Sequence, residues 1–205
     1  MRWLKRHWLR ILIHPVALLP LAILLLDFSQ GQLTANPIEE ITLRTGRTTL
    51  ILLTLSLSIT PINIVFGIRH LLPFRRTLGL YAFFYASLHL LTFIGLDYRF
   101  DFGLMLEDVG GKRFVLAGLA TFLSLLILTV TSTKGWRKRL GKNWVRLHWL
   151  AYLAAALAIT HFFWQTKADY SRPLLYGSIL AVLLLVRLPV VRKSLTKLRH
   201  RIIKK

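Results

Sequence analysis

The chain has 205 residues, of which 55% are hydrophobic and only 18% are charged, and its mean hydropathy is +0.55. This composition excludes an ordinary soluble domain and is typical of a membrane protein. There is no cysteine, and only two methionines are present. Disulfides, iron–sulfur clusters, zinc–thiolate sites and covalently attached c-type haem are therefore excluded. A buried redox metal would have to be held mainly by histidine.

Six stretches without a charged residue follow one another along the chain, and each is apolar over most or all of a membrane span. In lipid only a helix or a closed barrel satisfies its own backbone, and barrel strands would alternate polar and apolar residues. We therefore predict an all-α integral membrane bundle of six transmembrane helices, forming a single domain over residues 1–205. The last helix continues past Arg187, whose side chain we expect to reach the interface. The predicted helices cover approximately residues 11–28, 48–68, 77–96, 114–133, 147–166 and 173–191.

Charge is distributed unequally between the two sides of the predicted bundle. All eight acidic residues follow the first, third or fifth helix, whereas 21 of the 28 basic residues lie at the termini or in the second and fourth loops. By the positive-inside rule, both termini are cytoplasmic and the acidic loops face outward. The net charge of +20 then reflects the basic cytoplasmic segments, which set the topology and contact anionic lipid headgroups. We expect no nucleic-acid binding, because no compact basic domain remains to carry it. Because no internal repeat is evident in the sequence, an inverted-repeat transporter is not favoured.

Besides His14 near the start of the first span, three histidines lie inside predicted spans, and two of them share one depth. His89 is seven residues from the outer end of the third helix, and His161 is five from the outer end of the fifth. At about 1.5 Å of rise per residue, their depths differ by roughly 3 Å. Two imidazoles at one level can ligate opposite faces of a haem, which predicts a low-spin, electron-transferring b-type haem near the outer face. Alternatively, each histidine only hydrogen-bonds a backbone carbonyl or a hydroxyl.

His148 is the third of these histidines and could ligate a second, inner haem. It lies thirteen residues before His161, about 20 Å nearer the cytoplasm but about 140° around an ideal helix. Either the fifth helix carries a bulge or the two histidines face different partners. The third helix has Arg76 at the matching inner position. The better candidate for the opposite face is therefore His14 in the first span, ahead of His70 in an inner loop.

Three arginines lie near the ends of predicted helices. Arg75 and Arg76 precede the third helix on the inner side, and Arg47 precedes the second on the outer side. Guanidinium groups match carboxylates and phosphates, so each arginine could bind haem propionates or a flavin phosphate. Lipid headgroups are the alternative partner. The chain has no glycine-rich phosphate loop, Ser–His–Asp spacing or paired buried carboxylates, so no catalytic residue is predicted.

Several short motifs, in their order and spacing, resemble a known family. The chain is similar to the haem-binding membrane subunits of bacterial periplasmic methionine sulfoxide reductase systems, within the ferric-reductase-like transmembrane group. The similarity covers all but the last quarter of the chain. The matching motifs are Thr45-Gly46-Arg47, Ile59-Thr60-Pro61, Arg75-Arg76-Thr77-Leu78-Gly79-Leu80, Leu88-His89-Leu90, Thr131-Ser132-Thr133, Arg139-Leu140-Gly141-Lys142-Asn143-Trp144, Leu147-His148 and His161-Phe162-Phe163-Trp164.

The resemblance implies an electron-transfer subunit of an oxidoreductase complex rather than its catalytic subunit. It implies haem b held by His89 and His161, with His148 also important, and it implies FMN binding. Electrons would come from quinone or a cytoplasmic flavin reductase. They would pass to a periplasmic molybdopterin-containing methionine sulfoxide reductase that repairs oxidised proteins, so the location would be the bacterial inner membrane. Two other functions remain open: a stand-alone ferric reductase, and a haem-free membrane scaffold or small transporter.

Overall fold

The structure is a computed structural model that describes the backbone of residues 2–203 and the side chains of residues 8–107 and 109–199. Every regular element within the described backbone is helical, which confirms the predicted all-α class. Several charged side chains that entered the orientation argument lie outside the described residues: Arg2, Lys5, Arg6, Asp108, Arg201, Lys204 and Lys205.

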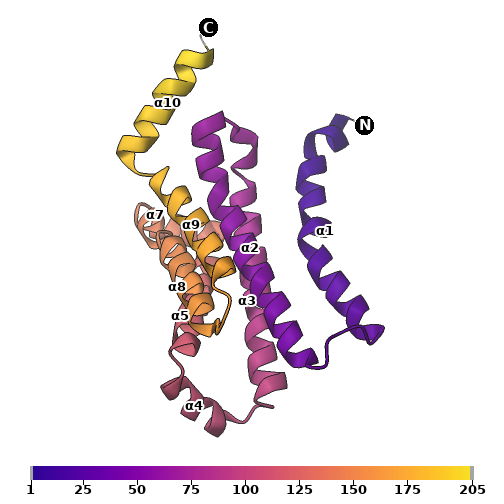
Figure 1. The fold of residues 1–205 in the computed structure, drawn as a ribbon. Helices are drawn as coiled ribbons and strands as arrows, with labels where there is room; N and C mark the ends of the chain where they lie inside the picture. The colour runs from indigo at the N-terminus through magenta and orange to yellow at the C-terminus, as the bar shows by residue number, and fades with distance from the viewer. Residues whose placement is uncertain (1, 204–205) are drawn as a thin grey trace.

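Over residues 2–203, seven long helices form the frame of the molecule, and five short ones connect them. The long helices are α1 (Arg2–Ser29), α2 (Pro37–Phe66), α3 (Phe74–Leu91), α5 (Arg113–Val130), α8 (Leu150–Gln165), α9 (Ser171–Leu185) and α10 (Pro189–Ile203). The short ones are η1 (Arg69–Leu71), η2 (Thr92–Asp97), α4 (Phe102–Gly111), α6 (Lys134–Leu140) and α7 (Asn143–Leu147). The beginning of α1 and the end of α10 lie at one end of the molecule, and α4 lies at the other (Figure 1).

Five segments of the described chain are long and apolar enough to cross a membrane. They cover Trp8–Ser29, Pro37–Phe66, Arg69–Asp97, Arg113–Val130 and Asn143–Gln165. The helices α9 and α10 pass the same test only together, and they are bent by 75° at their junction. The chain is therefore a multi-pass helical protein with five such spans, or six if the bent pair counts as one.

The predicted continuous sixth helix over 173–191 is wrong, because the structure breaks it between Leu185 and Pro189. Arg187 lies in this break. Its guanidinium turns inward, donating to the carbonyl of Leu57 and the hydroxyl of Tyr152. Pro189 has no N–H to continue the hydrogen-bond ladder, so it begins a new helix.

Two antiparallel helix pairs, α2 with α3 and α5 with α8, form the centre of the bundle (Figure 1). Ala82 on α3 and Ala154 on α8 are completely buried. Small residues at such positions let the backbones of neighbouring membrane helices approach closely. The surrounding core contains Leu52, Leu53, Leu57, Tyr85, Ala86, Leu125, Leu128, Ala155 and Leu180. These contacts hold α3 and α8, which carry His89 and His161, in one rigid unit.

Tyr85 on α3 connects the peripheral helix α1 to this centre. Its side chain is 1% exposed, and its hydroxyl donates to the carbonyl of Ala17 (2.8 Å) and accepts from the N–H of Leu21 (3.1 Å). In a regular helix those two backbone groups would bond to each other, so the hydroxyl is inserted into the ladder of α1. The neighbouring Pro20 also lacks an N–H. A tyrosine hydroxyl and a proline together thus set the shape of α1.

We expect Tyr85→Phe to lower the melting temperature of the purified protein. The change leaves two backbone groups of α1 without their hydroxyl partner, a loss of about 1–3 kcal/mol. Tyr176→Phe on α9 is the matched control, because the Tyr176 hydroxyl has no hydrogen bond within the described part of the chain. Thermal unfolding in detergent measures both variants. Equal melting temperatures for Tyr85→Phe and wild type would show that α1 closes its own ladder at no penalty.

Candidate functional site

The structure brings His89 and His161 together between the two central helix pairs. Their ring centroids lie 6.0 Å apart, and their ring planes meet at 87°. His89 comes from the last turn of α3, and His161 comes from α8. The two residues predicted to share one depth are therefore neighbours in space.

Each of these imidazoles is fixed by a backbone carbonyl on the partner helix of its pair. Nδ1 of His89 lies 2.9 Å from the carbonyl oxygen of Thr42 on α2. Nδ1 of His161 lies 2.6 Å from the carbonyl oxygen of Phe114 on α5. A carbonyl only accepts hydrogen bonds, so both Nδ1 atoms carry the proton. In a neutral imidazole the lone pair is then on Nε2, which is the arrangement found in most metal-bound histidines.

A glycine lies against the face of each ring. A Cβ atom added to Gly46 on α2 would lie 3.0 Å from Cε1 and Nδ1 of His89. A Cβ atom added to Gly118 on α5 would lie 2.9 Å from Nδ1 of His161 and 3.0 Å from its Cε1. Both imidazoles therefore pack directly on helix backbone.

The geometry of the His89–His161 pair fits a haem iron. With metal–imidazole bonds of about 2 Å, two rings on opposite sides of one metal have centroids about 6 Å apart, and the observed separation is 6.0 Å. Two protein ligands suit a haem because the porphyrin supplies the other four donors. Within the described residues there is no group of three or more His, Cys, Asp or Glu side chains that could hold a bare metal ion.

His148 lies in a turn between α7 and α8, not in the continuous helix predicted for 147–166. Its Nε2 is 3.3 Å from the hydroxyl of Thr131, and its ring stacks on Trp144 with centroids 3.9 Å apart. The indole N–H of Trp144 donates to the carbonyl of Thr131 (2.9 Å), which ties α7 to the end of α5. The angle of about 140° between His148 and His161 assumed an ideal helix and does not apply across this break.

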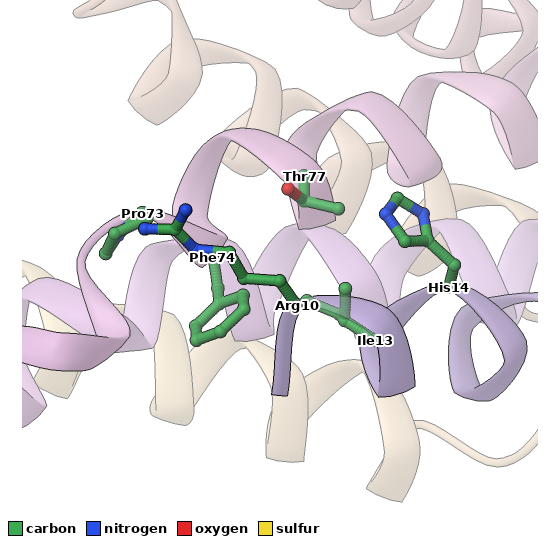
Figure 2. Close-up of a pocket in the computed structure, with 6 residues that line it drawn as sticks. All are labelled: Arg10, Ile13, His14, Pro73, Phe74 and Thr77. Atoms are coloured by element: carbon green, nitrogen blue, oxygen red, sulfur yellow. The ribbon is translucent and has the colours of Figure 1, made fainter. Parts of the chain in front are cut away.

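His14 is exposed on α1 and faces α3. Its Nδ1 is 2.9 Å from the hydroxyl of Tyr81. A pocket of about 230 Å³ lies between α1 and the start of α3. Figure 2 shows His14 with the other residues that line it: Arg10, Ile13, Pro73, Phe74 and Thr77. No contact joins His14 to His148 among the described side chains. The structure thus leaves the two predicted inner residues in separate environments, and the weaker candidate, His70, is exposed in η1.

The three predicted arginines are exposed, and the structure distributes them over both ends of the bundle. Arg75 donates to the hydroxyl of Thr60 (2.9 Å). Neither Arg75, Arg76 nor Arg47 forms a salt bridge within the described residues. Arg47 directly follows Gly46, the glycine whose added Cβ would meet the His89 ring.

Sequence reasoning missed Arg44, which forms both ion pairs found among the described side chains. It bridges Asp27 at the end of α1 and Glu40 one turn earlier on α2. The spacing of four residues between Glu40 and Arg44 is the signal that could have identified the second pair. Arg44 thereby joins the end of α1 to the beginning of α2, close in sequence to Thr42.

Comparison with known proteins places the chain in a family. The family described as "Ferric reductase like transmembrane component" matches residues 45–159. Similar proteins with the name "Protein-methionine-sulfoxide reductase heme-binding subunit MsrQ" include one from Rhodospirillum rubrum, 45% identical over 90% of this chain and 89% of that protein. Others come from Herminiimonas arsenicoxydans, at 48% identity over 83% of this chain and 80% of that protein, and from Xanthomonas axonopodis pv. citri, at 44% over 84% and 82%. The chain therefore belongs to the MsrQ family and carries its ferric-reductase-like transmembrane domain.

Proposed function

We propose that the chain is a haem b membrane electron-transfer subunit of a methionine sulfoxide reductase system. The observation that carries this proposal is the pair His89 and His161, with ring centroids 6.0 Å apart and both Nδ1 atoms turned to backbone carbonyls. The names of the similar MsrQ proteins support haem binding. The chain has no cysteine for covalent attachment, which supports haem b over haem c.

The protein's contribution is to hold two neutral imidazoles at a fixed separation. The Nε2 atoms of His89 and His161 would be the axial ligands, and the iron would supply one-electron chemistry when bound. The carbonyls of Thr42 and Phe114 keep each ring in the Nδ1–H tautomer and prevent it from rotating. With both imidazoles holding the iron, the site would suit electron transfer rather than binding of a reactant.

The direction of transfer follows from the proposed orientation. Six spans with both termini in the cytoplasm place the acidic loops and the outer ends of α3 and α8 on the periplasmic side of the bacterial inner membrane. The His89–His161 pair then lies near the outer face. Electrons would leave there for a periplasmic molybdopterin-containing methionine sulfoxide reductase, and Arg47 would pair with propionates on this side.

The inner side of the bundle would receive the electrons. The donor would be quinone or a cytoplasmic flavin reductase, with FMN bound at this side and Arg75 and Arg76 available for its phosphate. His148, held by Thr131 and stacked on Trp144, is the candidate ligand of a second haem. The His89–His161 pair supports one complete bis-histidine site at the outer level. His148, which has no contact with His14 among the described side chains, supports only a half-site at the inner level.

A difference spectrum tests the proposed function. The full chain is expressed with haem supplied, purified in detergent, and compared before and after dithionite reduction. We expect a sharp reduced α-band and a pyridine haemochrome of protohaem. A colourless protein would contradict the proposal. It would favour a scaffold in which the same Nδ1 hydrogen bonds only join α3 to α2 and α8 to α5.

The family match to ferric reductases favours one further candidate, a cytochrome b that reduces ferric iron directly. This candidate shares the haem and differs only in the electron acceptor. Mixing the reduced protein with a ferric chelate, or with a periplasmic methionine sulfoxide reductase, separates the two. We expect rapid reoxidation by the reductase alone.

A further inference from the structure

The surroundings of His89 and His161 repeat each other in sequence spacing as well as in geometry. On α2, the carbonyl that binds His89 belongs to Thr42, and the glycine packed on that ring follows four residues later at position 46. His89 follows Thr42 by 47 residues, and His161 follows Phe114, whose carbonyl it binds, by the same number. A repeat was not evident in the sequence, yet the structure contains two equivalent sockets, one for each imidazole.

The second socket shows that the arrangement is not specific to one helix pair. Its carbonyl belongs to Phe114, its glycine is Gly118, again four residues later, and its histidine is His161. One helical turn separates carbonyl and glycine in both cases, so both lie on the same face of their helix. A ring that binds the carbonyl must therefore lie flat over the glycine.

Only glycine fits this position without moving the ring. A methyl group at residue 46 or 118 would lie 2.9–3.0 Å from two ring atoms, closer than carbon atoms pack without repulsion. The ring cannot yield freely, since its Nδ1 is held by the carbonyl and its Nε2 would be held by the metal. Glycine is also a poor helix former, so its presence inside two packed helices is not explained by backbone preference.

We propose that Gly46 and Gly118 are positioning residues that set the orientation of the two imidazoles and keep each Nδ1–H on its carbonyl. This inference rests on the proposed function, because it concerns how His89 and His161 present their Nε2 atoms to haem. Hydrogen bonding at Nδ1 makes a ligand histidine more basic and so stabilises the ferric form. Gly46 and Gly118, which would not themselves bind the iron, thus lower the midpoint potential of the haem and strengthen haem binding.

The test compares Gly46→Ala and Gly118→Ala with two control glycines. A Cβ at Gly79 on α3 would meet only the Ser56 hydroxyl at 3.6 Å, and one at Gly177 on α9 would meet only Ile159 at 3.7 Å. All four variants are purified as full chains with haem supplied. The measurements are the haem-to-protein ratio, the midpoint potential from a redox titration, and the low-temperature EPR spectrum.

We expect Gly46→Ala and Gly118→Ala to shift the midpoint potential upward and to bind haem about 10-fold more weakly, the usual effect of disturbing an outer-shell partner of a metal ligand. Gly118→Ala should have the larger effect, because its contact is closer and its histidine has the shorter hydrogen bond. Gly79→Ala and Gly177→Ala should match wild type. If Gly118→Ala does not fold, the milder Gly46→Ala carries the same comparison.

Two outcomes overturn the inference in distinguishable ways. Wild-type potential, haem content and EPR spectrum in both Gly46→Ala and Gly118→Ala would show that the glycines do not position the rings, while the proposed function stands. Equal losses in the two control variants would show a general intolerance of alanine in these helices. A wild-type protein without haem would instead refute the proposed function itself.

Discussion

Alanine in place of His161 or of His89 should yield a protein that still inserts into the membrane but no longer holds the outer haem. Each change removes one of the two Nε2 donors, so the loss of haem affinity should exceed the roughly 10–100-fold that follows from disturbing an outer-shell partner. The fold should survive, because the one interhelical hydrogen bond lost with each ring contributes only about 0.6 kcal/mol in a membrane helix bundle. Pyridine haemochrome content per protein is the measurement.

The control for these variants is His70→Ala. His70 is exposed in η1, so its replacement should leave the haem content unchanged. Size-exclusion profiles of the three variants should coincide with that of wild type. If His89→Ala and His161→Ala retain the full α-band, the residues serve only to join α3 to α2 and α8 to α5.

The oxidised protein should give a highly anisotropic low-spin EPR signal. An imidazole ligand raises mainly the iron d orbital that lies perpendicular to its own ring plane. Rings at 87° therefore raise two d orbitals almost equally, and this near-degeneracy gives one very large g value and broad, weak features. Parallel rings would split the orbitals and give a well-resolved rhombic signal.

The EPR prediction is checked on wild-type protein at low temperature, with Gly177→Ala as a control that leaves both sockets intact. A rhombic signal would mean that the rings rotate on binding haem, against the hydrogen bonds to Thr42 and Phe114. A high-spin signal would mean that one histidine is not a ligand. Either result contradicts the ring arrangement described above.

Hydropathy and the rise per residue were sufficient to predict that His89 and His161 lie at one depth. That prediction needs only the ends of each span and a straight helix that crosses a membrane of fixed thickness. The same reasoning did not predict the break in the sixth helix beside Arg187. Its guanidinium finds the carbonyl of Leu57 and the hydroxyl of Tyr152 inside the bundle, which composition alone does not reveal. A sequence pattern locates a span, but side-chain hydrogen bonds decide where it bends.

The surroundings of His148 were harder to predict, also because a helix is interrupted. The angle between His148 and His161 was derived for an ideal fifth helix, with a bulge as the alternative. In the structure α7 ends at Leu147, and Trp144 ties it to the carbonyl of Thr131. The roles of Gly46 and Gly118 were also not predictable from one sequence, since glycine is frequent in membrane helices. Only the distances from each glycine to an imidazole identify them.

The most direct test is the haem content of four proteins measured side by side: wild type, His89→Ala, His161→Ala and the double variant. If both imidazoles bind one iron, either single change removes that haem completely, and the double variant loses no more than each single one. If the double variant loses twice as much haem as either single variant, the two histidines belong to separate sites, and the shared iron between α3 and α8 is refuted.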